Sequence, residues 1–214
     1  MALALVLLQA NPSGATEQAE ILCPGASAWR ATQASINTAK SRTARAVSKP
    51  TLRKKLLMLA QRDQEVRSET SEDLLGREAA DKDAFDAIKR IVARSGFPKE
   101  SEVGRDGVNA AWLLVQHASM DPGWQFEVLQ QLESSAASGE ISGEQFALLY
   151  DRVAVLYHHK MQKYGTQLQP GAETAQPLPI EEADSVDARR AELGMMPLRD
   201  YLCLATALRS ERRR

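Results

Sequence analysis

The sequence has few of the residues that usually indicate a function. Only two cysteines and three histidines occur in 214 residues, too few for a disulfide framework or a cysteine-rich zinc site. Lys and Arg number 27 against 28 Asp and Glu, and the resulting net charge of -1 gives no overall attraction for nucleic acid. No stretch approaches the ~20 apolar residues of a membrane span. Composition therefore predicts a globular protein with no nucleic-acid partner and no membrane span.

The common catalytic motifs are also missing. The chain has no glycine-rich phosphate loop, no G-x-S-x-G nucleophile elbow and no H-E-x-x-H zinc motif. His117 and Asp121 are four residues apart, but Pro122 interrupts the helix that would align them on an ion. His158 and His159 are adjacent, and on a helix they would point about 100° apart. The sequence therefore predicts no metal and no cofactor.

The two ends of the chain differ in composition from the middle. Residues 1–15 (MALALVLLQANPSGA) are a possible truncated signal segment, because a short apolar run precedes small residues. This favours export to the periplasm or beyond, and the alternative is a plain extension of a cytoplasmic protein. Residues 16–50 are expected to be a flexible extension and linker, rich in Thr, Ser, Lys, Arg and Ala toward their end. Residues 210–214 form a basic tail.

The two cysteines, Cys23 and Cys203, leave two alternatives. Leu202, Leu204 and Ala205 surround Cys203 in the sequence, which predicts a buried, inert thiol. A bridge between the two would form only if the protein is exported.

Residues 51–209 have a helical hydrophobic pattern. A stripe of leucines at helical spacing starts the pattern, and Asp63 falls on that stripe. Asp121 and Pro122 make a strong helix start, and Ser142 with Gln145 forms a capping box. The Gly- and Pro-punctuated segment 163–180 predicts a short β-hairpin. We therefore expect a mainly α fold, a single helical bundle-like domain of six to seven helices with a small hairpin. The expected helices lie near 51–66, 79–94, 107–119, 122–140, 143–156, 184–194 and 197–209.

Several polar residues interrupt the apolar faces of these helices. Buried polar groups are costly unless they are paired, so each one needs a structural or a functional partner. Gly165, between the helical and the extended pattern, is expected to have a positive φ or to approach another element closely.

The order of these segments resembles an uncharacterised bacterial family, domain of unknown function 6624. The matching segments are RDQEVR (62–67), FPKESEVG (97–104), AAWLLVQHASMDPGWQ (110–125), YDRV (150–153), QKYGTQ (162–167) and DARRAELGMMPLRDY (187–201). The family typically has an aspartate where this chain has Ser119, so that position is not expected to be essential. The resemblance implies the fold and the neighbourhood of a site, and it implies no activity.

The residues at the matching positions are mostly polar, and we expect many of them to converge on one pocket. Histidine is the side chain that ordinarily titrates near neutral pH, so His117 is the candidate acid/base, oriented by Asp63 or Asp151. Within that pocket, Gln167 or Tyr164 is expected to reach the imidazole. The remaining candidates would bind the ligand: Gln64, Arg67, Gln116, Asp121, Gln125, Arg152, Gln162, Tyr164, Gln167, Asp187 and Arg190.

Two classes of function fit these observations. The first is a metal-independent enzyme or small-ligand binder that uses the polar pocket, with Arg152 or Arg190 holding an anionic group. The second is a non-catalytic interaction or immunity-type module, in which the same residues only stabilise the helices and the partner is a protein. A shared site for these side chains would favour the first class, and separate structural contacts would favour the second.

Overall fold

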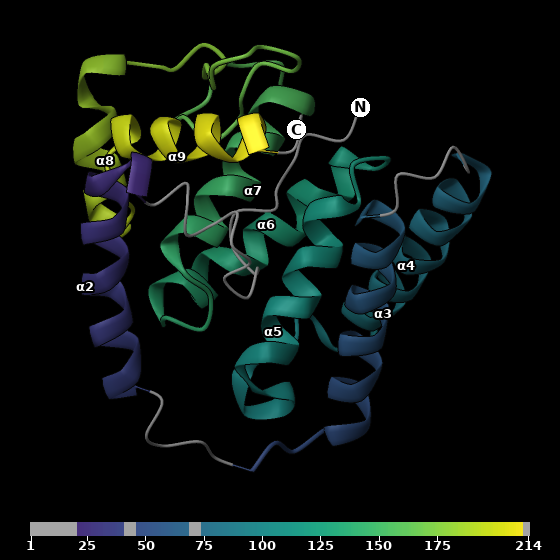
Figure 1. The fold of residues 1–214 in the computed structure, drawn as a ribbon. Helices are drawn as coiled ribbons and strands as arrows, with labels where there is room; N and C mark the ends of the chain where they lie inside the picture. The colour runs from purple at the N-terminus through teal and green to yellow at the C-terminus, as the bar shows by residue number, and fades with distance from the viewer. Residues whose placement is uncertain (1–20, 41–45, 69–73, 212–214) are drawn as a thin grey trace. The chain divides into compact units, whose positions relative to one another are not determined.

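The computed structural model describes residues 21–40, 46–68 and 74–211, and these are helical apart from turns and one irregular segment (Figure 1). The mainly α prediction is confirmed, with one helix more than expected. The helices of the described residues are α2 (Pro24–Lys40), α3 (Pro50–Ser68), α4 (Leu74–Ser95), α5 (Glu100–His117), α6 (Pro122–Ala137), α7 (Gly143–Leu156), α8 (Val186–Glu192) and α9 (Leu198–Glu211), with a 3₁₀ turn at Ala183–Ser185.

The chain divides into two compact units, where the sequence pattern suggested one bundle. The central unit is Arg45–Leu149, and the terminal unit combines Met1–Ala44 with Tyr150–Arg214. The boundary falls inside the unbroken helix α7, and this is why hydrophobic periodicity alone gives no sign of it.

The core of the central unit lies among α3, α4 and α5. Leu56 of α3, Ile88 of α4 and Val115 of α5 are fully buried. The predicted core stripe of α5 is confirmed, because Val108, Ala111 and Trp112 are buried as well. The Trp112 indole N–H donates to the carbonyl of Gln145 at 3.0 Å, so the largest side chain of this core is also hydrogen-bonded.

Replacing Trp112 by Ala should lower the free energy of unfolding by about 3–5 kcal/mol. The indole is 1% exposed, so its loss leaves a cavity and an unpaired carbonyl at Gln145. Urea unfolding followed by circular dichroism would measure the change. The same measurement on Trp29→Ala, at a partly buried tryptophan, is the control and should show a smaller loss.

The helix starts predicted for α6 and α7 are confirmed by their hydrogen bonds. The Asp121 carboxylate accepts the N–H of Trp124 at 2.9 Å, and Pro122 is the first helical residue. Ser142 and Gln145 form the reciprocal bonds of a capping box, at 2.9 and 3.1 Å. These caps fix where the chain turns at either end of α6.

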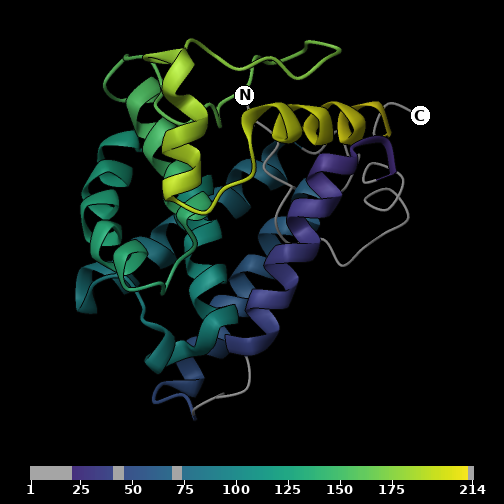
Figure 2. The ribbon, with the colours of Figure 1, turned by 90° about the vertical axis from the view of Figure 1, so that its left-hand side faces the viewer.

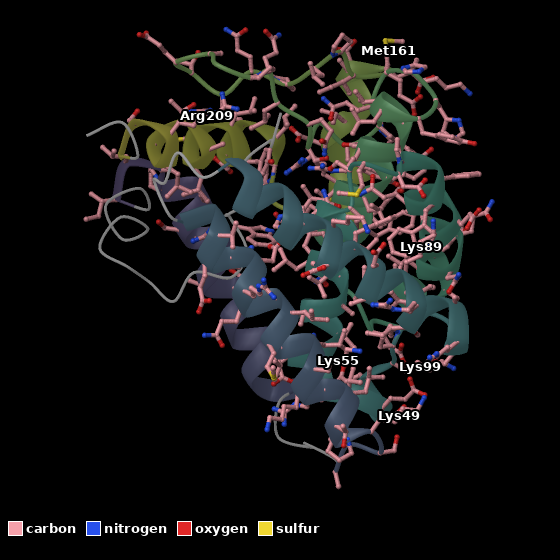
Figure 3. All side chains as sticks on the ribbon, turned by 90° about the vertical axis from the view of Figure 1, so that its right-hand side faces the viewer. Lys49, Lys55, Lys89, Lys99, Met161 and Arg209 are labelled. Carbon is pink, nitrogen blue, oxygen red and sulfur yellow. A yellow bond between two sulfur atoms is a disulfide. The ribbon has the colours of Figure 1, made fainter. Side chains whose placement is uncertain are left out.

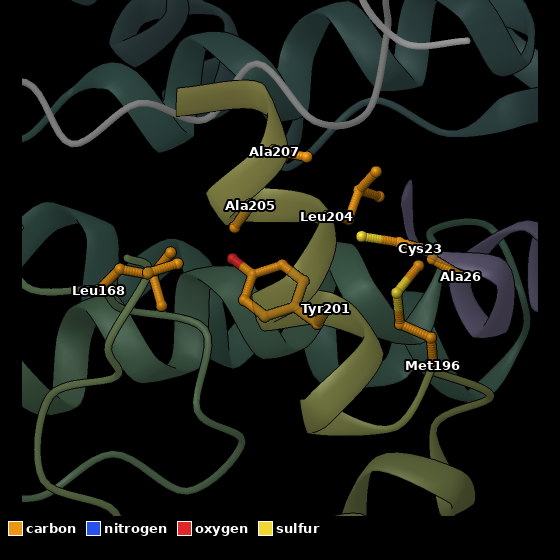
Figure 4. Close-up of a cluster of buried hydrophobic side chains, with 9 residues drawn as sticks. Cys23, Ala26, Leu168, Met196, Tyr201, Leu204, Ala205 and Ala207 are labelled. Carbon is orange, nitrogen blue, oxygen red and sulfur yellow. The ribbon is translucent and has the colours of Figure 1, made fainter. Parts of the chain in front are cut away.

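In the terminal unit, the start of α2 lies beside α9 (Figure 1, Figure 2). The two helices approach closely, since a Cβ atom on Gly25 would overlap the Asp200 carboxylate. Ala26 is fully buried in the apolar cluster around Leu204 and Tyr201 (Figure 4). The expectation that residues 16–50 are a flexible linker is wrong for Pro24–Lys40. Its alanines favour helix and are small enough to pack against α9.

Cys23 and Cys203 are joined by a disulfide, with 5.9 Å between their Cα atoms. The prediction of a buried free thiol at Cys203 is therefore wrong, and Cys203 is an exposed residue of α9. Its neighbours Leu204 and Ala205 are buried, whereas Cys203 is bonded to Cys23. The bond ties the first described helix of the chain to the last.

The β-hairpin predicted for 163–180 does not form in the described chain, where the segment has only two isolated bridges, Gln162 with Ile180 and Leu168 with Pro177. Pro170, Pro177 and Pro179 have no N–H to donate to a ladder. The N–H groups of 163, 164 and 166 donate to Asp151 instead of a second strand. A braced irregular loop replaces the hairpin.

The backbone conformation of this loop requires a glycine at position 165. Its φ is +72°, and a Cβ atom there would come within 2.8 Å of Leu198 and 3.0 Å of Ile180. Both parts of the expectation for this glycine, a positive φ and a close approach, are confirmed.

No helix in the described parts of the chain combines the length and the apolar composition needed to cross a membrane.

Candidate functional site

His117 and Asp63 form a hydrogen-bonded pair in the central unit. His117 is the last residue of α5, and its Nδ1 lies 2.6 Å from Oδ2 of Asp63 on α3. The Asp63 side chain is only 2% exposed, whereas the His117 side chain is 13% exposed. The aspartate is therefore enclosed and the imidazole reaches the surface of the protein.

The charge of the Asp63 carboxylate determines which ring nitrogen of His117 carries the proton. An ionised carboxylate only accepts hydrogen bonds, so Nδ1 must carry the proton that His117 donates to Asp63. Proton exchange with another molecule would then take place at Nε2, the other ring nitrogen. Gln64 also donates to Oδ2 of Asp63, at 2.8 Å, which holds the carboxylate in position. This is the arrangement of a histidine base oriented by an aspartate.

The turn that follows His117 carries a second charged pair. Lys89 of α4, which is labelled in Figure 3, donates to Oδ2 of Asp121 at 2.9 Å. The Trp124 N–H, and then the Lys89 ammonium, lower the pKa of the Asp121 carboxyl. Phe85 supports the lysine, with its ring centroid 5.2 Å from Nζ. The role of Asp121 as the N-cap of α6 gives this residue a structural explanation, as its position before Pro122 predicted.

Two glutamines of the predicted set are fully buried at this end of α5. Gln125 of α6 donates from Nε2 to the carbonyls of Val115 and Gln116, at 2.8 and 3.2 Å. These are carbonyls at the end of a helix, which have no partner within it. Gln125 therefore joins α6 to the end of α5, one residue before His117.

In the terminal unit, the predicted polar residues meet around the loop 162–167. The Asp151 carboxylate of α7 accepts the N–H groups of Lys163, Tyr164 and Thr166, at 2.8, 3.0 and 2.9 Å, and the Thr166 hydroxyl at 2.9 Å. Burial raises the pKa of Asp151, and these donors act in the opposite direction. Asp151 therefore braces the loop, and the partner of His117 in the structure is Asp63.

Arg190 and Gln162 brace the same loop from other sides. Arg190, fully buried, donates to the carbonyls of Tyr164 and Met196, each at 2.7 Å, and lies over the Tyr201 ring. Gln162 accepts the N–H of Gln167 at 2.7 Å and donates to its carbonyl at 2.9 Å. Burial raises the pKa of Tyr164 to about 12. These contacts are those of a structural network.

The candidate residues thus divide between the two units. Asp187 accepts the N–H of Leu198 and caps α9. Arg152 is buried, and the side chain of Arg67 lies outside the described residues. Convergence of the whole set on one pocket, with Gln167 or Tyr164 beside His117, stays a prediction. The central unit holds Asp63, Gln64, Arg67, Gln116, His117, Asp121 and Gln125, and the terminal unit holds Asp151, Arg152, Gln162, Tyr164, Gln167, Asp187 and Arg190.

Metal-ligating side chains do not gather in the described residues: no three of His, Cys, Asp or Glu come together where they could hold an ion.

Comparison with known proteins connects this arrangement to a family. The model of DUF6624, a family of unknown function, matches residues 50–209. The chain belongs to the DUF6624 family. No curated protein and no solved structure matches the chain.

The DUF6624 match contains both groups of polar residues and Cys203, whereas α2 and Cys23 precede it. The candidate set predicted from the sequence did not include four residues that these networks use. Lys89 pairs with Asp121, Thr166 donates to Asp151, Arg189 donates to the carbonyl of Lys163, and Tyr201 donates to the carbonyl of Thr166.

Proposed function

We propose that the domain is a metal-independent acid–base catalyst in which His117 transfers a proton at Nε2. Asp63 orients the imidazole from Nδ1 and stabilises its protonated form, and Gln64 positions Asp63. The reaction would begin with His117 taking a proton from water or from a substrate hydroxyl or amine. It would end with the return of that proton to the leaving group.

The observation that carries this proposal is the 2.6 Å pair of an enclosed carboxylate with a partly exposed histidine. Burying a carboxylate costs free energy, so an enclosed aspartate paired with a histidine needs a reason. The cost is understandable when the carboxylate prepares the imidazole for proton transfer.

A second function, a non-catalytic interaction module, is favoured by the terminal unit. Asp151, Gln162 and Arg190 donate to or accept from the main chain of one loop, which a purely structural role explains. In this alternative His117 and Asp63 would be one more structural pair, and substitution of His117 would change stability without changing any reaction.

Replacing Asp63 by Asn should change the tautomer of His117. The wild-type carboxylate requires the proton on Nδ1, whereas the asparagine NH₂ can donate to Nδ1 and move the proton to Nε2. Nitrogen-15 NMR of the histidine ring distinguishes the protonated nitrogen from the unprotonated one, so the test needs no substrate. An Nε2–H tautomer in the wild-type protein would contradict the proposed orientation.

His117→Asn separates catalysis from stability. The asparagine NH₂ can replace Nδ1 as a donor to Asp63, but the variant has no group equivalent to Nε2. We expect the free energy of unfolding to change by no more than ~1–2 kcal/mol. Hydrolysis of p-nitrophenyl acetate or p-nitroacetanilide should fall by about 10²–10⁴-fold.

The matched control is His158→Asn, at an exposed histidine of the terminal unit, which should leave the hydrolysis rate unchanged. Equal rates in His117→Asn and wild type, together with a loss of stability, would support the interaction module instead.

A further inference from the structure

The two ends of the Cys23–Cys203 disulfide differ in their access to solvent. Cys23 is 2% exposed and packs with Ala26 and Leu204 in the apolar cluster of the terminal unit (Figure 4). Cys203 lies in the middle of α9 and is exposed. The main chain inside a helix is covered by its own side chains, so the exposed surface of Cys203 lies largely on Cβ and Sγ. An external molecule can therefore reach one end of the bond and not the other.

This difference determines how the bond can be opened in the folded protein. Thiol–disulfide exchange begins when a thiolate attacks one of the two sulfurs, and its rate depends on access to that sulfur. Attack on Sγ of Cys23 would first require the surrounding apolar side chains to move apart. Attack on Sγ of Cys203 requires no such movement, and the sulfur that leaves is then Cys23.

We propose that Cys203 is a site of reversible modification by low-molecular-weight thiols, with Cys23 as the leaving group. The sulfur of the incoming thiolate bonds to Sγ of Cys203 while the bond between Cys203 and Cys23 breaks. The electron pair of that bond stays on Cys23, which takes a proton from water. One disulfide replaces another, so the incoming thiol is the only co-reactant. The proposal does not depend on the function of His117.

The products of this exchange are compatible with the structure around the bond. Protonated Cys23 is a small, weakly polar thiol, and free cysteines are among the residues most often found in apolar interiors. The added thiol group on Cys203 is on the exposed side of α9, where it displaces none of the buried side chains of the cluster. Attack by the Cys23 thiolate on Cys203 restores the original bond and releases the thiol, so the modification is reversible.

The modification should loosen the start of α2 and leave α9 in place. The Tyr201 hydroxyl donates to the carbonyl of Thr166 at 3.1 Å, and the Thr206 hydroxyl accepts the N–H of Ala175 at 2.9 Å. These bonds hold α9 to the loop of the terminal unit and do not involve the disulfide. The start of α2 has no such polar ties to α9 among the hydrogen bonds given above, so the disulfide contributes more to its position. Docking of α2 would thus respond to the balance of thiol and disulfide around the protein.

The position of the first mixed disulfide tests the proposal. The oxidised full chain is incubated with reduced glutathione, quenched early with acid, digested with pepsin without reductant, and analysed by mass spectrometry. Glutathione should be found on the Cys203 peptide about tenfold or more above the Cys23 peptide. The control is the same reaction in guanidinium, where both sulfurs are accessible and both peptides should be modified to similar extents. Equal modification of the two peptides in the folded protein, a preference for Cys23, or no mixed disulfide without denaturant would overturn the proposal.

Hydrogen exchange of the glutathionylated protein tests the conformational consequence. The amides of residues 26–29, in the first turns of α2, should exchange about tenfold or more faster than in the oxidised protein. The amides of α9, and those of Tyr164 and Thr166 that donate to Asp151, should keep their protection. Equal loss of protection in α2 and α9 would mean that the thiol reacts only with an unfolded terminal unit, and this would also overturn the proposal.

Discussion

Reduction of the Cys23–Cys203 disulfide is expected to lower the free energy of unfolding by about 3–5 kcal/mol. The two cysteines are 180 positions apart in the sequence, so the bond closes one of the longest loops that the chain allows. In the chain-entropy account, closing a long loop in the unfolded state removes much of its conformational freedom, and the stabilisation grows with the logarithm of loop length.

The contacts around the disulfide indicate which part of the structure would be destabilised by its reduction. Cys23 is 2% exposed and packs in the cluster with Ala26 and Leu204 (Figure 4). Without the bond, this small apolar cluster would be a main contact between α2 and α9 in the described residues. We therefore expect α2 to separate from α9 before the rest of the terminal unit unfolds.

Guanidinium unfolding with and without a phosphine reductant measures the effect, and Cys23→Ser/Cys203→Ser is the matched control. The double variant should unfold like the reduced protein and should not respond to the reductant. Thiol titration of the denatured chain should find no free thiol before reduction and two after it. Identical unfolding curves with two free thiols from the start would contradict the bond.

A confirmed bond would also support the proposal that the protein works in an oxidising compartment. Disulfides are rare where thioredoxin and glutathione keep thiols reduced. The alternative, a cytoplasmic protein, predicts free thiols in protein isolated with rapid alkylation.

The helices could be predicted because their signals are local. Asp121 with Pro122, and Ser142 with Gln145, are start signals that depend on residues no more than three positions apart, and both form as expected. The missed helix α2 is stabilised by contacts with α9 and a disulfide, which depend on residues at the other end of the chain. The hairpin prediction was wrong for the same reason, since Asp151 on α7 takes the N–H groups that a second strand would need.

The candidate site could also be predicted only in part. An aspartate on a leucine stripe and a histidine at the end of an apolar run identify Asp63 and His117 as polar residues that need partners. Sequence reasoning left Asp63 and Asp151 equal as the partner of His117. Only the packing of α3 against α5 selects Asp63. Lys89 could not be predicted in this way. In the sequence it looks like any other exposed lysine on an amphipathic helix, and only the structure shows that it lies beside Asp121.

Replacing Asp151 by Ala should destabilise the terminal unit by about 3–5 kcal/mol or more. The carboxylate accepts three main-chain N–H groups and one hydroxyl, and Ala leaves all four donors without this acceptor. Two of the residues concerned, Tyr164 and Thr166, are buried, so water cannot easily replace the lost oxygen atoms. The amides of Lys163, Tyr164 and Thr166 should lose their protection from hydrogen exchange.

Asp187→Ala is the matched control in the same unit. Asp187 is exposed and accepts one N–H, from Leu198 at 2.7 Å, so its loss should cost about 1 kcal/mol, as removal of a helix cap does. Asp151→Asn should fall between the two, because one oxygen remains while the new NH₂ faces the donors of the loop. Unchanged exchange rates at 163–166 in Asp151→Ala would show that the loop does not depend on this carboxylate.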